Sequence, residues 1–293
     1  MMYVVPVFTD EGNHQVNAES NMWIWVATTL AFTGAIFSWA GEVSAAPAAS
    51  CSGPQRVSSG PSTVGIAELY TSEGCDSCPP ADKWFSRLSA RKDGVVPLAF
   101  HVDYWDYIGW KDRFAQAAFS ERQRDSVRRQ GGRTSYTPQV MLNGQDQRIW
   151  SDQSRFSSSL KEIAARVPRA NLALEFTTAT TQLDTALTVA LPQIPDRTDA
   201  AVFLAITESN LSNRVTAGEN RGSTLKHDHV VRRLIGPLGG DAKDRADGKL
   251  VVKRAMPLDQ DWKRNDLQLV AFVQNLRTGE VYQALSAPVC VGL

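Results

Sequence analysis

Residues 64–85 read VGIAELYTSEGCDSCPPADKWF, and this stretch decides the fold that we expect. It opens with a short apolar run, residues 64–70, which is typical of a buried β-strand. Two cysteines, Cys75 and Cys78, follow where that pattern ends, and two prolines come directly after the second cysteine. Proline is tolerated at the first positions of a helix, where a missing backbone N–H costs little. The sequence therefore predicts a cysteine pair at a strand-to-helix turn.

The patterns after this turn predict a helix, a strand, a second helix, a β-hairpin and a third helix. Helical crossovers imply parallel strands with right-handed connections. This order of elements is that of the thioredoxin core, so we expect an α/β fold with a thioredoxin-like N-terminal domain over residues 64–168. The predicted elements cover residues 81–91, 95–102, 114–130, 139–150 and 152–167.

The character of the sequence changes after residue 168. Short β-type runs follow, turn-prone stretches separate them, and helical periodicity is poor. We therefore predict a β-rich, sandwich-like C-terminal domain over residues 169–293. Its apolar runs cover residues 183–191, 200–207, 249–255, 267–274 and 281–285.

The N-terminal segment, residues 1–50, carries the pattern of an export signal. Residues 23–40 hold no charge and small residues follow, which is typical of a cleavable secretory signal. A retained membrane anchor is the alternative, because a run of this length is just long enough to span a bilayer. A linker rich in Gly, Pro and Ser covers residues 51–63. We expect a periplasmic or secreted protein, with membrane contact only through an uncleaved or lipidated N-terminus.

Two further cysteines lie near opposite ends of the exported part. Cys51 follows Ala48-Ala49-Ser50, which resembles a lipoprotein processing site, so this cysteine could carry a lipid. Cys51 could instead form a disulfide with Cys290, because chain termini are often close in space and export permits disulfides. The two fates exclude each other, and the sequence leaves both open.

The composition is that of an ordinary globular protein, with 43% hydrophobic and 21% charged residues among 293. Lys and Arg number 31, as do Asp and Glu, and the first 50 residues hold four of the acidic residues and no basic ones. The remainder is therefore mildly basic, which gives no reason to expect nucleic acid as a partner. The alternating charges of residues 121–129 indicate a solvated helix face.

A cysteine pair at a helix N-terminus favours thiol–disulfide exchange, because the partial positive charge there lowers a thiol pKa. Cys75 precedes the predicted helix and is expected to be exposed as the attacking thiolate. Cys78 lies in the first turn and is expected to be shielded as the resolving thiol. An inert structural disulfide and half of a zinc site are the alternatives. For zinc, the His227-x-His229 pair lacks the spacing of the usual finger.

Two other positions are expected to serve this dithiol. Thr137-Pro138 precedes the predicted hairpin strand, where the thioredoxin fold keeps a cis-proline opposite its dithiol, and X-Pro is the bond type for which cis is cheap. Glu68 lies in the otherwise apolar first strand, where a carboxylate is costly unless it is paired or protonated. We expect Glu68 either to carry a proton for the dithiol or to reach the surface at the strand end.

The stretch HVDYWDYIGW, residues 101–110, follows a predicted strand. It leaves the sheet at the edge where the cysteines are expected, and ligands of open α/β sheets collect at that edge. Its aromatic, histidine and carboxylate side chains could form a binding wall or a metal site. A packed loop with a satisfied histidine is the alternative. The candidate binding residues are His101, Asp103, Tyr104, Trp105 and Thr137.

Several motifs together resemble one known family. They are ELYTSEGCDSCPPAD (68–82), the HVDYWDYIGW block, FSERQR (119–124) and YTPQ (136–139), with RVTAGEN and TLKHDHVVR further on. This set resembles the secreted thioredoxin-like family catalogued as domain of unknown function 1223, from about residue 64 to residue 285. The resemblance implies a thioredoxin-like fold and names no substrate. The residues after Cys78 differ from those of ordinary thioredoxins, in which a charged residue usually follows the second cysteine.

The sequence thus favours an exported thiol–disulfide oxidoreductase or thiol-redox partner that needs no cofactor. It would act on protein thiols, protein disulfides or a small thiol. One alternative is a copper- or other metal-handling protein that uses Cys75, Cys78 and His101, since thiolate and imidazole ligands suit copper. Another is a binding module whose disulfide is structural. The catalytic candidates are Cys75, Cys78, Pro138 and Glu68.

Overall fold

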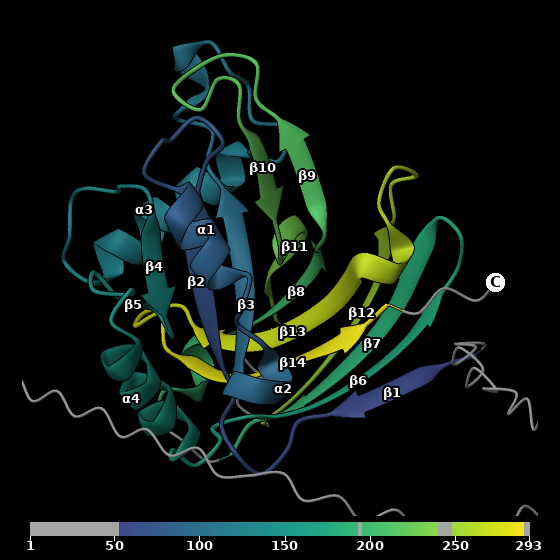
Figure 1. The fold of residues 1–293 in the computed structure, drawn as a ribbon. Coiled ribbons are helices and arrows are strands. Elements are labelled where there is room, and N and C mark those ends of the chain that lie inside the picture. Colours follow the sequence, from purple (N-terminus) through teal and green to yellow (C-terminus); the bar gives the residue numbers. More distant parts are fainter. Residues whose placement is uncertain (1–52, 193–194, 240–247, 290–293) are drawn as a thin grey trace, which may run out of the picture. The chain divides into compact units, whose positions relative to one another are not determined.

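An eight-stranded sheet runs through both halves of the chain in the computed structural model, which describes residues 53–192, 195–239 and 248–289 (Figure 1). Most neighbouring strands of this sheet are antiparallel. The exception is β3 (Val95–His101), which pairs in parallel with β2 (Gly65–Thr71) on one side and with β11 (Val230–Leu238) on the other. In spatial order the strands are β14 (Val281–Pro288), β13 (Leu267–Asn275), β8 (Ala200–Glu208), β11 (Val230–Leu238), β3 (Val95–His101), β2 (Gly65–Thr71), β4 (Gln139–Leu142) and β5 (Gln145–Asp146).

The predicted fold class, α/β with a thioredoxin-like N-terminal domain and a β-rich C-terminal domain, is wrong. Strands hold far more of the described residues than helices do, and strands from residues 64–168 share one sheet with strands from residues 169–293. The individual elements of the first half lie close to their predicted ranges. Hydrophobic periodicity reports such local elements, but it does not say which distant strands pair. The pairing of Val230 with Ala99, which joins β11 to β3, connects the two halves.

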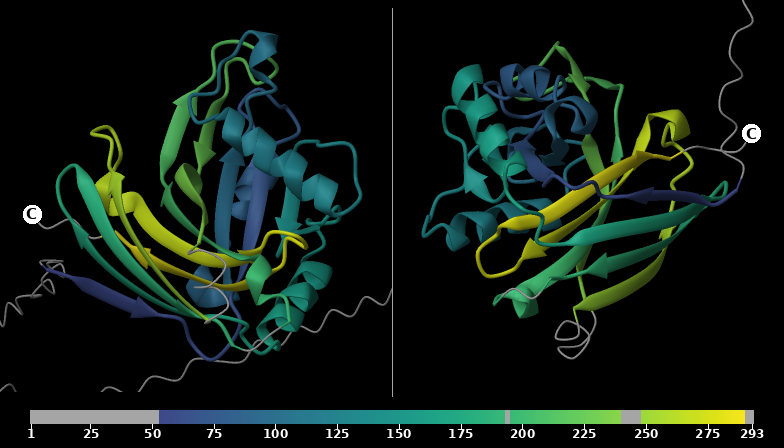
Figure 2. Two further views of the ribbon diagram at one scale, coloured as in Figure 1. Left: turned by 180° about the vertical axis from the view of Figure 1, so that it is seen from behind. Right: turned by 90° about the horizontal axis from the view of Figure 1, so that it is seen from below.

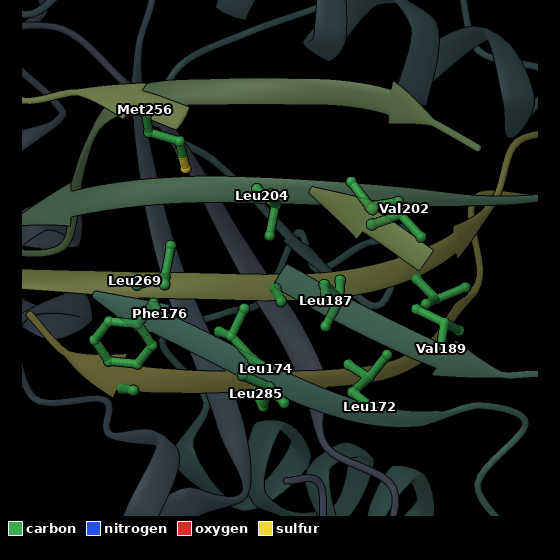
Figure 3. Packing of buried hydrophobic residues seen from close by; sticks show 14 of the residues in the cluster. Leu172, Leu174, Phe176, Leu187, Val189, Val202, Leu204, Met256, Leu269 and Leu285 are labelled. Carbon is green, nitrogen blue, oxygen red and sulfur yellow. The ribbon is translucent and has the colours of Figure 1, made fainter. Parts of the chain in front are cut away.

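A second sheet of four antiparallel strands packs on the large sheet through a shared apolar core (Figure 3). Its strands are β1 (Gln55–Ser58), β6 (Asn171–Thr178), β7 (Gln182–Ala190) and β12 (Lys249–Pro257), in that order. Alternate residues of β6 and β7 are buried, as expected for strands with one face on a core and one face in water. Core residues from both sheets include Leu172, Leu174, Leu187 and Val189 on one side and Val202, Leu204, Leu269 and Leu285 on the other.

Helices α1 (Pro79–Phe85), α3 (Ala117–Arg129) and α4 (Gln153–Ala164) cover the large sheet around β2. Leu69 packs in one cluster with residues of α1 and α4, whereas Tyr70 packs in another with residues of α3. Successive side chains of a strand point to opposite faces. Helix α3 therefore lies on the face of β2 opposite to α1 and α4, and a side chain of β2 meets only one of these layers.

A two-stranded hairpin, β9 (Leu211–Arg214) and β10 (Thr224–His227), carries a long connecting loop, residues 215–223. Figure 1 and the left view of Figure 2 place this loop beside the short turn η1 (Asp106–Ile108). The contact is close, because a Cβ added to Gly218 would lie 3.1 Å from Ile108 Cδ1. Two segments far apart in the sequence thus meet. The remaining short elements are α2 (Ala90–Asp93), η2 (Arg197–Asp199) and η3 (Arg264–Asp266).

Some of the sequence predictions fall outside the described residues. These are the export segment, residues 1–50, and both fates of Cys51 and Cys290. They remain predictions. Within residues 53–192, 195–239 and 248–289, no helix combines the length and the apolar character needed to cross a membrane.

Candidate functional site

Cys75 and Cys78 form a disulfide in the turn that joins β2 to α1, with their Cα atoms 5.4 Å apart. Cys78 caps the helix, and two prolines occupy its first positions, as predicted from the sequence. The Cys78 carbonyl accepts the amides of Ala81 and Asp82, so its backbone is fixed by the first turn. Cys75 precedes this turn and its amide donates to the Ser72 carbonyl at 3.2 Å.

The prediction that Cys75 is exposed is wrong, because both Cys75 and Cys78 are 0% exposed. Side chains from another loop cover the turn: a Cβ on Gly74 would lie 3.0 Å from Trp105 Cβ and 3.3 Å from Ile108 Cδ1. The residues between the cysteines, Asp76 and Ser77, are exposed. The disulfide therefore lies directly beneath the surface, with these two residues above it.

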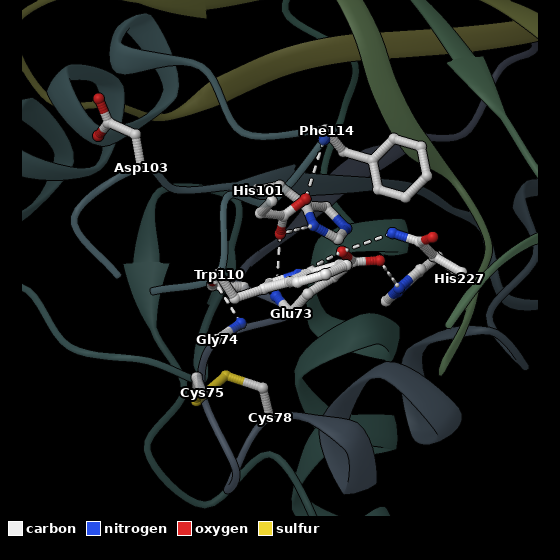
Figure 4. A network of polar contacts seen from close by, with 12 residues as sticks. Glu73, Gly74, Cys75, Cys78, His101, Asp103, Trp110, Phe114 and His227 are labelled. Carbon is white, nitrogen blue, oxygen red and sulfur yellow. Dashed lines mark hydrogen bonds and ion pairs between the residues drawn. A yellow bond between two sulfur atoms is a disulfide. The ribbon is translucent and has the colours of Figure 1, made fainter. Parts of the chain in front are cut away.

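Glu73, two residues before Cys75, is fully buried and is the centre of a polar network (Figure 4). Its Oε2 atom accepts hydrogen bonds at 2.9 Å from Trp110 Nε1 and from Asn213 Nδ2. Its Oε1 atom lies 3.1 Å from His227 Nε2. A carboxylate in this position is satisfied by three side chains, two of which come from the β9–β10 hairpin in the second half of the chain.

His101 ends strand β3 and forms a buried pair with Asp112, with 2.6 Å between Nδ1 and Oδ2. Burial opposes protonation of the imidazole, but the Asp112 carboxylate outweighs it and raises the pKa of His101. Burial likewise opposes ionisation of Asp112, but His101 and backbone amides lower the pKa of that carboxyl. Both shifts favour the charged forms, an imidazolium beside a carboxylate. Asp112 also accepts the amide of Glu73 at 2.9 Å, which ties the pair to the network.

The two imidazoles of the network touch edge to face, with ring centroids of His101 and His227 4.8 Å apart. Phe114 packs against both rings, at 5.2 and 5.6 Å between centroids. Within the described part of the chain, His101 Nε2 and His227 Nδ1 have no hydrogen-bond partner. Each buried imidazole is thus hydrogen-bonded through one of its two nitrogens.

Asp82 connects this pair of imidazoles to helix α1. It is 8% exposed and follows Cys78 by one helical turn. Burial raises the pKa of its carboxyl, and the charges of His227 and His101 offset this only in part. Asp82 and the two imidazoles line one space too small for a water molecule. Helix α1 therefore presents to the two imidazoles a carboxyl whose pKa is raised.

The structure brings the predicted aromatic loop and the predicted proline together beside the disulfide turn. Thr137-Pro138 is a cis peptide bond, as predicted. Trp105 Nε1 donates to Thr137 Oγ1 at 2.7 Å, and Trp105 also packs on Gly74. The neighbouring Tyr104 hydroxyl donates to Gln123 Oε1 at 3.1 Å, and burial raises the pKa of Tyr104 to about 12. Trp105 thus forms a wall that links the turn to Thr137-Pro138.

Two other candidates lie away from the disulfide. Asp103 accepts a 2.5 Å hydrogen bond from Ser120 and points away from the network (Figure 4). Glu68 is fully buried and pairs with Arg122 on α3, 2.6 Å from Nε to Oε1. This pair lies on the face of β2 opposite to α1. The interpretation of the α3 charges as a solvated face is wrong for Arg122, which is buried, although Arg128 is exposed.

Sequence reasoning missed most of the network. The missed residues share one property, which is that they are polar side chains packed around the turn, all of them buried except the half-buried Asn213. A weak signal existed, since Glu73 and Asp82 flank the cysteines in the sequence. Cys75, Cys78 and His101 are the residues of the alternative metal site; among the described residues, no group of three or more His, Cys, Asp or Glu is placed to hold a metal ion. The missed residues are Glu73, Asp82, Asp112, Asn213, Asn220 and His227.

A sequence profile of the family described as protein of unknown function DUF1223 matches residues 66–274. The chain belongs to this family. The match covers the disulfide turn, the network and the β9–β10 hairpin of this DUF1223 chain, so the site lies inside the family domain.

Two solved structures share the fold of the DUF1223 chain. One is the crystal structure of a protein from Agrobacterium tumefaciens, with 23% identity, 78% of this chain and 95% of that chain covered, and a TM-score of 0.55. The other is HBP35 of Porphyromonas gingivalis, with 15% identity, 78% and 76% covered, and a TM-score of 0.58. At these identities the similarity concerns the fold alone. No curated protein matches the sequence.

Proposed function

We propose that this chain carries out thiol–disulfide exchange through Cys75 and Cys78, as an exported protein that acts on protein thiols or a small thiol. One observation carries the proposal: the disulfide lies next to a buried cluster of two imidazoles and three carboxyls. Reduction of a disulfide delivers two protons to the protein as well as two electrons, and such a cluster can supply and store protons. Export is supported by the uncharged segment at residues 23–40, and a disulfide suits an oxidising compartment.

The short span of the disulfide supports a chemical role over a purely structural one. The two cysteines are three positions apart. In the chain-entropy account, a disulfide that closes a loop this short stabilises the folded state by about 2 kcal/mol, against about 3 kcal/mol for a 15-residue loop. A cross-link that constrains so little of the unfolded chain has limited value as a staple.

In the proposed reaction, a partner thiolate attacks the sulfur of Cys75. The Cys75–Cys78 bond breaks, a mixed disulfide forms between Cys75 and the partner, and Cys78 leaves as a thiolate. A second partner thiolate then attacks the partner sulfur of the mixed disulfide and releases Cys75. The partner pair is oxidised to a disulfide, the protein pair is reduced by two electrons, and the two partner protons end on the cysteines. The reverse sequence oxidises the protein pair.

Cys75 is the sulfur that we assign to the partner, because its backbone precedes the helix whereas that of Cys78 is fixed in the first turn. Asp82 is the proton donor to the Cys78 thiolate, since its raised pKa favours the protonated carboxyl. We assign the return of that proton to His101, whose imidazole lines the same small space as Asp82. A partner is expected to lie beside Thr137-Pro138, which Trp105 holds through its hydrogen bond to Thr137 Oγ1.

A binding module with a structural disulfide is the second candidate function, and the burial of both cysteines favours it. Trapping experiments separate the two. In C78S the Cys75 thiolate should attack partner disulfides, release one partner thiolate and accumulate as an unresolved mixed disulfide, whereas C75S should accumulate none and lose exchange. Wild-type exchange by both single variants with a model disulfide would leave the structural function as the better account.

A further inference from the structure

We infer that Asn220, on the β9–β10 loop, is a positioning residue that holds the disulfide turn closed and limits access to Cys75. The inference rests on the proposed exchange function and concerns its regulation. Asn220 is 9% exposed and lies 145 residues after Cys75 in the sequence. Nothing in its local sequence indicates a role at the cysteines.

The side-chain amide of Asn220 makes two hydrogen bonds to the backbone of the turn. Its Nδ2 atom donates at 2.9 Å to the Glu73 carbonyl and at 2.9 Å to the Cys75 carbonyl. These carbonyls stand on either side of Gly74. One NH₂ group thus joins two points of the turn and adds to the backbone bonds of Cys75, whose carbonyl also accepts the Cys78 amide at 3.3 Å.

A second contact from the same loop reaches the residue that covers the sulfurs. Asp76 lies between the cysteines, and its amide donates to Glu219 Oε2 at 3.2 Å. Gly218 packs on η1 and on the residues after it, where an added Cβ would lie 3.1 Å from Ile108 Cδ1 and 3.3 Å from Trp110 Cβ, and its φ of +72° suits glycine. The loop therefore contacts both the disulfide turn and the aromatic segment that packs over it.

The loop is braced within itself, so it acts as a rigid clamp. Val215, which is fully buried, donates its amide to the Ser223 carbonyl at 2.9 Å and accepts the Gly222 amide at 2.8 Å. Ser223 in turn donates to the Asn220 carbonyl at 3.0 Å. A partner sulfur reaches Cys75 only when the turn moves, because the cysteine is 0% exposed, and the clamp opposes that movement. Loss of the Asn220 amide should therefore speed the opening.

The test measures how fast excess tris(2-carboxyethyl)phosphine reduces the Cys75–Cys78 disulfide of the folded protein, with alkylation and mass spectrometry to count thiols. N220A should be reduced about 10-fold faster than wild type, because alanine makes neither hydrogen bond. N275A is the matched control. Asn275 is another buried asparagine whose amide donates two hydrogen bonds, to Asp196 and Tyr282, and the N275A rate should stay within about twofold of wild type.

A wild-type rate in N220A overturns the inference. An equal acceleration in N275A, at an equal loss of unfolding free energy, also overturns it, because Asn220 would then act through global stability. If N220A does not fold, E219A replaces it. Glu219 is exposed, and its loss should speed reduction about threefold, so a wild-type rate in E219A would refute the clamp.

Exchange with reduced glutathione distinguishes failure of the proposed exchange function from failure of the clamp. If phosphine reduces N220A faster than wild type, but neither protein exchanges with reduced glutathione, the clamp stands and the proposed function does not. If both proteins exchange with glutathione at the same rate and phosphine also finds no difference, the proposed function stands and the clamp does not.

Discussion

Replacement of Arg122 by leucine should destabilise the protein by about 3–5 kcal/mol, because a buried carboxylate loses its partner. Arg122 lies 2.6 Å from Glu68, and the side chains are 8% and 0% exposed. The guanidinium also donates to Gln274 Oε1 at 3.1 Å and stands over the Phe203 ring at 5.2 Å. Water cannot replace arginine at this depth, so the Glu68 charge carries the cost. The double variant E68L/R122L should lie within about 1 kcal/mol of wild type, since an apolar pair of similar volume replaces the ion pair.

Equilibrium urea unfolding of wild type, R122L, E68L and the double variant, all with the disulfide oxidised, measures the four free energies. Tryptophan fluorescence provides the signal, since the chain holds eight tryptophans. The cycle should yield a coupling energy of about 3 kcal/mol. A cost below about 1 kcal/mol for R122L would refute the reasoning, as would a double variant as unstable as R122L.

The remaining predictions concern the network and the N-terminus. The raised pKa of His101 stabilises the folded protein fully below about pH 6.5, and this stabilisation is lost as the pH rises through the folded pKa. The lowered pKa of Asp112 stabilises the folded protein above about pH 4, and this stabilisation is lost as the pH falls. D112N should remove both effects, so urea unfolding should show the largest deficit between about pH 4 and 6.5; a pH-independent deficit would count against the pair. D82N should raise the unfolding free energy at pH 7, because the raised pKa of Asp82 makes its ionisation costly in the folded state. D82N should also slow exchange with glutathione, and unchanged kinetics would remove Asp82 from the proton path. Mass spectrometry of protein from the native host should find the mature N-terminus between about residues 45 and 51; soluble cytoplasmic protein with intact Met1 or Met22 would contradict export.

The parts of the site that the sequence predicts correctly are those that local pattern controls. Cys75 and Cys78 lie at a strand-to-helix turn because an apolar run, a CxxC spacing and two prolines are contiguous. Thr137-Pro138 is cis, as its place before strand β4 suggests. Each of these features depends on a few neighbouring residues, so one sequence is enough to show them.

The parts that the sequence does not predict depend on contacts between distant segments. The network joins Glu73 to Asp112, Asn213 and His227, and the last two come from the second half of the chain. Asn220, whose side-chain amide donates to the Cys75 carbonyl, likewise lies on a loop that sequence reasoning assigned to another domain. The hydrophobic pattern of a segment does not show with which distant strand it pairs. The parallel contact between β11 and β3, which brings these residues to the turn, joins segments that are far apart in the sequence.

The central claim is that Cys75 and Cys78 exchange with thiols while the protein stays folded. The direct measurement is the midpoint potential of this pair in glutathione buffers, with alkylation and mass spectrometry for its redox state and far-UV circular dichroism for the fold. The exchange function predicts a reversible two-electron transition above about −270 mV with the spectrum unchanged. A disulfide that stays oxidised below about −300 mV, and is reduced only when the protein unfolds, would contradict the account.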